Sequence, residues 1–165
     1  MPSLPLRTLQ IITALQESGV ETVLYGSQGI SLYIGTFKQF GDIDLLVDSK
    51  WVEGRWQKLI KIMNGLGFTM QHEHEHEFVD SENTFVAFAS TDILIRDGIA
   101  SSFSSAIQEL RVAGKNIKTL KPEAFLKAYE FSMQDGYRKD VRVKKDKEVM
   151  VLINDYLSHH SRPAS

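Results

Sequence analysis

Apolar and polar positions alternate along the chain with two different periods, which predict helices and strands in turn. In residues 5–18, apolar side chains at three-residue steps form one face of a helix. Residues 23–25 are a short apolar run, typical of a buried strand, and this run ends at Gly26 and Ser27. A short helix is expected next, over residues 28–35. The first part of the chain is therefore predicted to be helix, strand and helix.

The strongest strand pattern lies in residues 42–47. Because successive side chains of a strand point to opposite faces, two aspartates and a leucine should share one face, and three apolar residues should share the other. The first set is Asp42, Asp44 and Leu46, and the second is Ile43, Leu45 and Val47. The two acids thus belong to a strand whose opposite face is wholly apolar.

A helix and a hairpin are expected after this strand. Asp48 or Ser49 can cap the helix, and its apolar face would hold Val52, Trp56, Leu59 and Met63. Residues 68–79 and 84–90 flank a polar segment, which predicts a hairpin. The second of these segments has large apolar groups on both faces, so it should be a central strand.

The last third of the chain predicts a second hairpin and two helices. Residues 91–106 are expected to form a loop with one helical turn, before strands over residues 109–112 and 116–119. Pro122 suits the first turn of a helix that runs to about residue 134. A final helix follows, with an apolar stripe of Val149, Leu152, Ile153 and Tyr156.

This order of elements predicts an α/β (α+β) fold, with a mixed sheet flanked by helices and a C-terminal helical part. The 165 residues suit one domain. We expect residues 1–120 to form its core, residues 121–158 to add helices packed on that core, and residues 159–165 to be a disordered tail.

Composition and charge narrow the classes of function. The net charge is −2, so the chain has no overall basic field for duplex nucleic acid. The absence of cysteine excludes disulfides and thiolate metal sites, and it favours a reducing compartment. No apolar run approaches the roughly 20 residues of a membrane span, and the start lacks the pattern of a signal peptide. A cytoplasmic protein without a membrane partner is expected.

Gly26 and Ser27 stand where the first strand is predicted to run into a helix. Glycine allows a phosphate to approach the backbone closely, and a helix start offers free N–H groups and the positive end of the helix dipole. The Ser27 hydroxyl can add one more donor. Strand–Gly–Ser–helix turns are also common without any ligand, so this feature gains weight only in combination with a second one.

Asp42 and Asp44 supply that second feature. Their positions, two apart on a strand, put both carboxylates on one face, roughly 6–7 Å apart at Cα. A divalent cation between them would relieve their repulsion, and Mg²⁺ suits hard oxygen ligands that come partly from substrate phosphates. The alternative is a strand end with solvated acids or an arginine partner. Sixteen positions separate Gly26 from Asp42, enough for a short helix and a loop that bring both segments to one edge of a sheet.

In this combination the chain resembles the DNA polymerase beta-like nucleotidyltransferase superfamily, and its small single-domain members most of all. The resemblance rests on Gly26-Ser27 followed by Asp42-Ile43-Asp44, and it extends less specifically over residues 10–157. The weaker matches are residues 117–123 with Lys127, and Lys145-Asp146 followed by Leu152.

The resemblance implies a mechanism and a set of site residues. Members bind a nucleoside triphosphate with two Mg²⁺ ions, and a hydroxyl acceptor attacks the α-phosphorus while pyrophosphate leaves. Carried over to this chain, Gly26 and Ser27 would hold the triphosphate, and Asp42 and Asp44 would hold the metal ions. The acceptor stays open among a small molecule, a protein and RNA.

The third family carboxylate is the point at which this chain departs from the pattern. The matching strand is Val86-Ala87-Phe88, which places alanine at the acidic position. Two replacements are open: Asp92, if the strand register differs, or Glu77 or Glu75 from the paired strand. A complete site favours an Mg²⁺-dependent nucleotidyltransferase. An incomplete site favours a non-catalytic binding module of the same fold, for example one component of a toxin–antitoxin-type pair.

A histidine–glutamate run and a basic cluster can each be interpreted either as a ligand-binding feature or as an ordinary polar surface. Residues 72–77 alternate histidine and glutamate; in a strand His72, His74 and His76 would share a face, and two imidazoles can share Zn²⁺ or Ni²⁺. A polar, partly exposed hairpin is the favoured interpretation. Six basic residues between positions 138 and 147 can contact phosphates, although such clusters are more often solvated faces.

Overall fold

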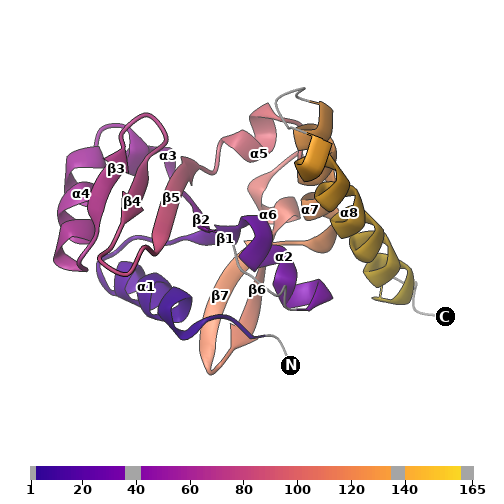
Figure 1. Ribbon diagram of the computed structural model, residues 1–165, viewed down its shortest axis with the longest axis horizontal. Coiled ribbons are helices and arrows are strands. Elements are labelled where there is room, and N and C mark those ends of the chain that lie inside the picture. The colour runs from indigo at the N-terminus through magenta and orange to yellow at the C-terminus, as the bar shows by residue number, and fades with distance from the viewer. Residues whose placement is uncertain (1–2, 36–41, 135–139, 161–165) are drawn as a thin grey trace.

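The computed structural model describes residues 3–35, 42–134 and 140–160. Of residues 134 and 140–145 it describes the backbone alone. A seven-stranded mixed sheet runs through the molecule in the order β3-β4-β5-β2-β1-β7-β6 (Figure 1). Its strands are β1 (Val23–Tyr25), β2 (Ile43–Val47), β3 (Thr69–His72), β4 (Glu77–Val79), β5 (Phe85–Ser90), β6 (Ile107–Val112) and β7 (Lys115–Leu120). This mixed sheet with flanking helices confirms the predicted α/β fold.

Helices cover both faces of this sheet. They are α1 (Leu6–Glu17), α2 (Gly26–Ile34), α3 (Ser49–Val52), α4 (Trp56–Gly65), α5 (Ile93–Arg96), α6 (Phe103–Ala106), α7 (Pro122–Gln134) and α8 (Asp140–His160). In Figure 1, α4 lies beside the β3–β5 end of the sheet, and α7 and α8 lie together on the other side of the molecule. None of the helices in the described part of the chain combines the length and the apolar character that crossing a bilayer requires.

Strand β2 separates two hydrophobic clusters. Ile43, Leu45 and Val47 pack into the cluster that includes α1 and α4, whereas Leu46 packs into the cluster that includes α2, α7 and α8. This alternation confirms the two faces predicted for residues 42–47, and it places Asp44 on the Leu46 face.

Several predicted boundaries hold, and others move. Helix α1, strand β1, the β6–β7 hairpin and the start of α7 at Pro122 lie where the pattern predicts them. The helix predicted through residues 52–63 is instead two helices, α3 and α4, with a turn at Gly54, a residue that weakens a helix interior. Residues 91–106 form two short helices rather than one turn.

The C-terminal helix also departs from expectation. His159 and His160 were expected in a disordered tail, but they belong to α8, where their Nδ1 atoms lie 2.8 and 2.9 Å from the backbone oxygens of Asp155 and Tyr156. Leu152 was expected in the apolar stripe but is 45% exposed, while Val149 and Ile153 are buried. The helix therefore packs through a narrower stripe than predicted.

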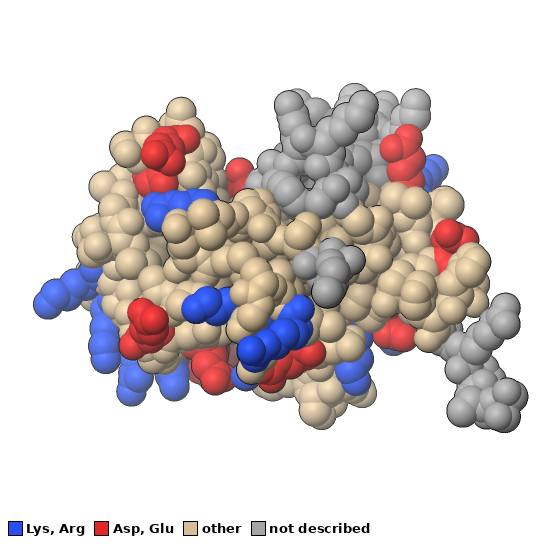
Figure 2. All heavy atoms as spheres, turned by 90° about the horizontal axis from the view of Figure 1, so that it is seen from below, with Lys and Arg blue, Asp and Glu red and all other residues tan. Residues whose placement is uncertain are grey.

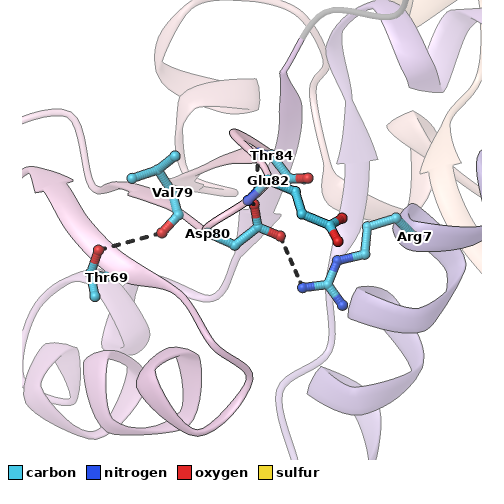
Figure 3. Close-up of polar contacts among 6 residues, drawn as sticks. All are labelled: Arg7, Thr69, Val79, Asp80, Glu82 and Thr84. Atoms are coloured by element: carbon cyan, nitrogen blue, oxygen red, sulfur yellow. Dashed lines mark hydrogen bonds and ion pairs between the residues drawn. The ribbon is translucent and has the colours of Figure 1, made fainter.

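A partly buried polar contact joins the N-terminal helix α1 to the β4–β5 hairpin (Figure 3). The Arg7 guanidinium donates a hydrogen bond to Asp80 Oδ2 at 3.1 Å, and it lies 5.1 Å from the centre of the Phe68 ring. Asp80 Oδ1 accepts from the backbone N–H groups of Glu82 and Thr84 at 2.9 and 2.8 Å. The Asp80 carboxylate thus organises the β4–β5 turn and joins it to α1.

Candidate functional site

The sheet register brings the glycine turn and the acidic strand together. Strands β1 and β2 are antiparallel neighbours, and Tyr25 pairs with Asp44. The last residue of β1 therefore lies beside the second residue of β2, and the chain enters α2 at the same edge of the sheet. This is the spatial relation that the sequence predicts for Gly26 and Asp44.

Gly26 lies directly against the Asp44 carboxylate. Its φ is +67°, in the left-handed region that favours glycine. A Cβ added at Gly26 would overlap Asp44 Oδ2 and would lie 3.2 Å from its Cγ. Backbone conformation and space therefore both require glycine here, and the start of α2 is held close to a carboxylate.

Helix α2 has an uncapped N-terminus at this place. The helix is nine residues long, no side chain caps it, and its first turn contains no acid. Ser27 is its second residue and is half-buried. A helix start of this kind offers backbone N–H groups and a partial positive charge to an anion.

Packing fixes the position of this helix start. A Cβ at Gly29 would lie 2.7 Å from Phe125 Cζ and 2.9 Å from the Leu24 carbonyl oxygen, so α2 sits tightly between β1 and α7. Thr119 Oγ1 donates to the same Leu24 oxygen at 2.8 Å. Sequence reasoning missed Gly29 and Thr119. The Gly-x-x-Gly spacing from Gly26, one helical turn, was the signal that could have found the first of them.

The electrostatics around Asp44 are those of crowded carboxylates. Burial, then the charge of Asp42, then the charge of Glu77 raise the pKa of Asp44 to about 7. Asp42 is exposed, just before β2. The cost of a buried anion and the repulsion of two neighbours make this carboxylate a strong attractor for a proton or a cation.

Asp44, Ala87 and Glu77 occupy one row across three strands. Asp44 pairs with Ala87 between the parallel strands β2 and β5, and Ala87 pairs with Glu77 between the antiparallel strands β5 and β4. Residues paired in this way direct their side chains to the same face of the sheet. Ala87 thus stands beside Asp44, as the matched segment Val86-Ala87-Phe88 suggested, and Glu77 stands one strand further out.

Asp92 lies elsewhere. Ser90 pairs with Val47 at the far end of β2, and the Thr91 N–H donates to the Val47 carbonyl oxygen at 2.9 Å. Asp92 follows this point, is exposed, and donates its backbone N–H to Ser90 Oγ at 3.0 Å. Asp44 is near the start of β2, so the register places Asp92 at the opposite edge of the sheet from the two aspartates.

The His-Glu run forms a turn rather than a continuous strand. Residues 73–76 connect β3 to β4, which corrects the expectation that three histidines share one strand face. The His76 backbone has a φ of 50°, and its ring lies edge-on to Trp56 with the ring centres 4.6 Å apart. Burial lowers the pKa of His76.

Possible metal ligands and basic side chains were both considered in the sequence as clusters that could bind ions or phosphates. Within residues 3–35, 42–134 and 146–160, no three His, Asp or Glu side chains lie close enough together to hold a metal ion as they stand. On the face shown in Figure 2, basic and acidic side chains are interspersed. Most of the predicted basic cluster between positions 138 and 147 falls outside the described side chains; Lys147 is exposed.

Comparisons with known proteins agree with this architecture. No known family model matches the chain. It is 30% identical over 139 residues to the uncharacterized protein YnaI of Bacillus subtilis (strain 168), a match that covers 84% of this chain and 87% of YnaI.

Solved structures show the fold. The lincosamide antibiotic adenylyltransferase LnuA, in its lincomycin-bound crystal structure, superposes with a TM-score of 0.66 at 16% identity, over 94% of this chain and 99% of that one. A nucleotidyltransferase-like protein from Paracoccidioides brasiliensis gives 0.60 at 16% identity, over 93% and 78%. The antibiotic-resistance factor ANT(2'')-Ia gives 0.58 at 15% identity, over 94% and 92%.

Proposed function

We propose that the chain binds a nucleoside triphosphate with Mg²⁺ and transfers the nucleoside monophosphate group to a hydroxyl acceptor. The chain belongs to the family of the Bacillus subtilis protein YnaI. Its fold, which is that of the nucleotidyltransferase superfamily, supports the proposal. The observation that carries this proposal is the contact between Gly26 and the Asp44 carboxylate. It joins a place suited to phosphate oxygens to a place suited to a cation, which is the pairing that a metal-bound triphosphate needs.

In this proposal the start of α2 receives the triphosphate. The uncapped first turn supplies backbone N–H donors and the positive end of the helix dipole. Ser27 can add its hydroxyl. Gly26 has no side chain, so the phosphate oxygens can approach the backbone next to Asp44. The packing of Gly29 against Phe125 and β1 keeps these donors in place.

The aspartates fit the role of Mg²⁺ ligands by their chemistry. Asp42 and Asp44 offer hard carboxylate oxygens. The raised pKa of Asp44 reflects burial first and then the negative charges of Asp42 and Glu77, which a cation would neutralise. Bound Mg²⁺ would screen the triphosphate charge and stabilise the negative charge that develops during transfer. The two aspartates would orient the triphosphate relative to α2.

The reaction itself balances without a covalent intermediate on the protein. The acceptor oxygen forms a bond to the α-phosphorus, the bond from that phosphorus to the bridging oxygen breaks, and pyrophosphate leaves with the electron pair. The acceptor proton passes to solvent or to a carboxylate. The residues of the chain contribute positioning and charge, which is how phosphoryl-transfer sites work in general.

Proteins that share this fold suggest which acceptors to test first. LnuA is described as an antibiotic adenylyltransferase, and ANT(2'')-Ia as an antibiotic-resistance factor. Small hydroxyl compounds therefore come first in an acceptor screen, ahead of proteins and RNA. Identities of 15–16% support this order of testing and nothing more specific about the acceptor.

A second candidate function follows from Ala87. This residue occupies the position next to Asp44 where a further carboxylate would complete the cation site. A chain that keeps the glycine turn and both aspartates without such a group would bind the nucleotide and transfer it slowly or not at all. A nucleotide-binding module is therefore the alternative to an enzyme.

Calorimetry with a non-hydrolysable ATP analogue tests the shared part of both functions. We expect Mg²⁺-dependent binding by the natural chain, and at least a tenfold weaker affinity for Asp44→Asn. Asp48→Asn is the matched control, because Asp48 caps α3 at the other end of β2 and an asparagine can still accept the hydrogen bond from the Lys50 N–H. Equal affinity in all three proteins would refute the proposed site.

The two functions are then separated by turnover. Release of pyrophosphate from ATP, GTP, CTP or UTP, with a panel of hydroxyl acceptors, supports the enzyme. Mg²⁺-dependent nucleotide binding without pyrophosphate release across the panel supports the binding module.

A further inference from the structure

The row formed by Asp44, Ala87 and Glu77 places a third acid on the same face of the sheet as the proposed cation site. Neighbouring strands lie about 4.8 Å apart, so Asp44 and Glu77 are roughly 10 Å apart at Cα. The residue between them is alanine, whose side chain is a single methyl group. No large side chain of β5 therefore stands between the two carboxylates.

The lengths of the side chains suit this gap. A glutamate carboxyl group is one C–C bond, about 1.5 Å, further from the backbone than an aspartate carboxyl group. Oxygens that share one octahedral Mg²⁺ are separated by about 3 Å when adjacent and about 4 Å when opposite, since each lies about 2.0–2.1 Å from the ion. An acid placed one strand further from Asp44 can thus reach a shared cation if it is glutamate, after a change of rotamer.

The surroundings of Glu77 also indicate a function other than packing. Glu77 is half-buried in β4, and its side chain makes no ion pair or hydrogen bond with the described residues. Two carboxylates on the same face of the sheet repel each other, and a cation between them would relieve that repulsion.

We propose that Glu77 is a cation-binding residue of this site, acting from β4 across Ala87 in place of an acid on β5. The inference rests on the proposed function, because the uncapped start of α2 and the Gly26 contact are what make the neighbouring space a site for a phosphate-bound cation. Glu77 completes the ligand set for a second ion, and the neighbouring strand supplies the charge that residue 87 lacks.

The number of bound ions tests this assignment. Mn²⁺ replaces Mg²⁺, and electron paramagnetic resonance of free Mn²⁺ counts the ions bound per chain in the presence of the non-hydrolysable ATP analogue. We expect two ions for the natural chain, one for Glu77→Gln, and a loss of nucleotide-dependent binding for Asp44→Asn. Glu73→Gln is the control, since Glu73 is an exposed acid in the adjacent turn of the same segment.

Moving the carboxylate provides a second, independent measurement. In the double variant Glu77→Gln/Ala87→Asp, the acid stands on β5 beside Asp44, and we expect the second Mn²⁺ ion to return. A variant that had merely lost its fold would not regain the ion in this way. Thermal unfolding and circular dichroism of each variant confirm that the compared proteins are folded.

The outcomes separate this inference from the function on which it rests. Two ions bound by Glu77→Gln, or no recovery in the double variant, would overturn the role of Glu77 while leaving the site at Asp42 and Asp44 intact. Unchanged nucleotide-dependent Mn²⁺ binding by Asp44→Asn would instead remove the proposed site altogether, and the role of Glu77 with it.

Discussion

Gly26 and Asp44 are in direct contact, although 17 positions of the chain lie between them, and the contact leaves no room for a side chain on the glycine. The antiparallel pairing of β1 and β2 produces it, because Tyr25 is the partner of Asp44. The same contact joins the start of a helix to a half-buried carboxylate. The proposed nucleotide site therefore depends on a relationship that a single methyl group would disrupt.

Gly26→Ala should weaken nucleotide binding and stability together. An alanine at φ +67° costs about 1–2 kcal/mol of backbone strain, and its Cβ would displace the Asp44 carboxylate. We expect at least a tenfold loss of affinity for the ATP analogue by calorimetry. Gly19→Ala is the control: Gly19 has a φ of +84° but open space around its Cα, so the control carries the strain without the collision. A control that loses as much affinity as Gly26→Ala would contradict the role of the contact.

The pKa of Asp44 predicts how stability varies with pH in the metal-free protein. Its folded-state pKa is about 7 and its ordinary value is 3.8, so the folded state holds the proton more tightly than the unfolded state. This contribution to stability is complete below pH 3.8 and is lost as the pH rises through 7. Its full size is at most about 4 kcal/mol, at 1.36 kcal/mol per pKa unit.

Urea unfolding in EDTA between pH 5 and 8 measures this effect. We expect the free energy of unfolding of the natural chain to fall over this range, and that of Asp44→Asn to change less. Asp44→Asn should therefore be the more stable protein at pH 8. Asp80 does not contribute to the change over this pH range. Burial opposes its ionisation, but the N–H groups of Thr84 and Glu82 and the Arg7 guanidinium outweigh burial and lower its pKa. Its contribution to stability is therefore lost only at more acid pH. Parallel pH profiles would disprove the assignment to Asp44.

The local pattern of the sequence was sufficient to predict that Gly26 and Asp44, the residues of the proposed site on β1 and β2, lie together. The alternation of residues 42–47 places Asp44 on the opposite face from Ile43 and Leu45, and the short connection from Gly26 leaves few ways to arrange the two strands. Both facts depend on neighbouring residues and on the chain length between two elements, which a sequence records directly.

The other half of the site depends on registers that the sequence does not record. Glu77 faces Ala87 because the β4–β5 turn is fixed by the side chain of Asp80, which accepts two backbone N–H groups of that turn. The sequence did not predict the turn at residues 73–76, because the regular alternation of histidine and glutamate is typical of a strand. Asp92 is close to β5 in sequence, yet β5 continues to Ser90 and carries Asp92 past the site.

The Asp80 carboxylate should stabilise the fold in two separable ways. Asp80→Asn keeps an oxygen that can accept from the N–H groups of Glu82 and Thr84 but loses the charge that pairs with Arg7. The Arg7 side chain is 39% exposed, so we expect a loss of at most about 1 kcal/mol. Asp80→Ala also removes the acceptor of both N–H groups, which adds about 0.5–1.5 kcal/mol for each hydrogen bond. Urea unfolding of the two variants gives both values, and equal losses would show that the turn does not depend on this oxygen.

Gly29 should be as intolerant of a side chain as Gly26, for a different reason. A Cβ there would lie 2.7 Å from Phe125 Cζ, 2.9 Å from the Leu24 oxygen and 3.0 Å from Thr119 Oγ1. Gly29→Ala should therefore destabilise the protein by about 1–3 kcal/mol through overpacking. Gly65→Ala in α4 is the control, since open space surrounds Gly65 and alanine is the better helix former by up to about 1 kcal/mol.

The double variant Gly29→Ala/Phe125→Leu locates the strain. Leucine removes the ring atom that lies closest to the added methyl group, but the Leu24 oxygen belongs to the backbone of β1 and cannot withdraw. We expect the double variant to be more stable than the sum of the two single losses predicts, by about 0.5–3 kcal/mol, which is the range for residues in contact. Strictly additive losses of unfolding free energy would show that α2 moves away from β1 as a unit. In that case the start of α2 would move away from Asp44, and Gly29→Ala should bind the ATP analogue more weakly.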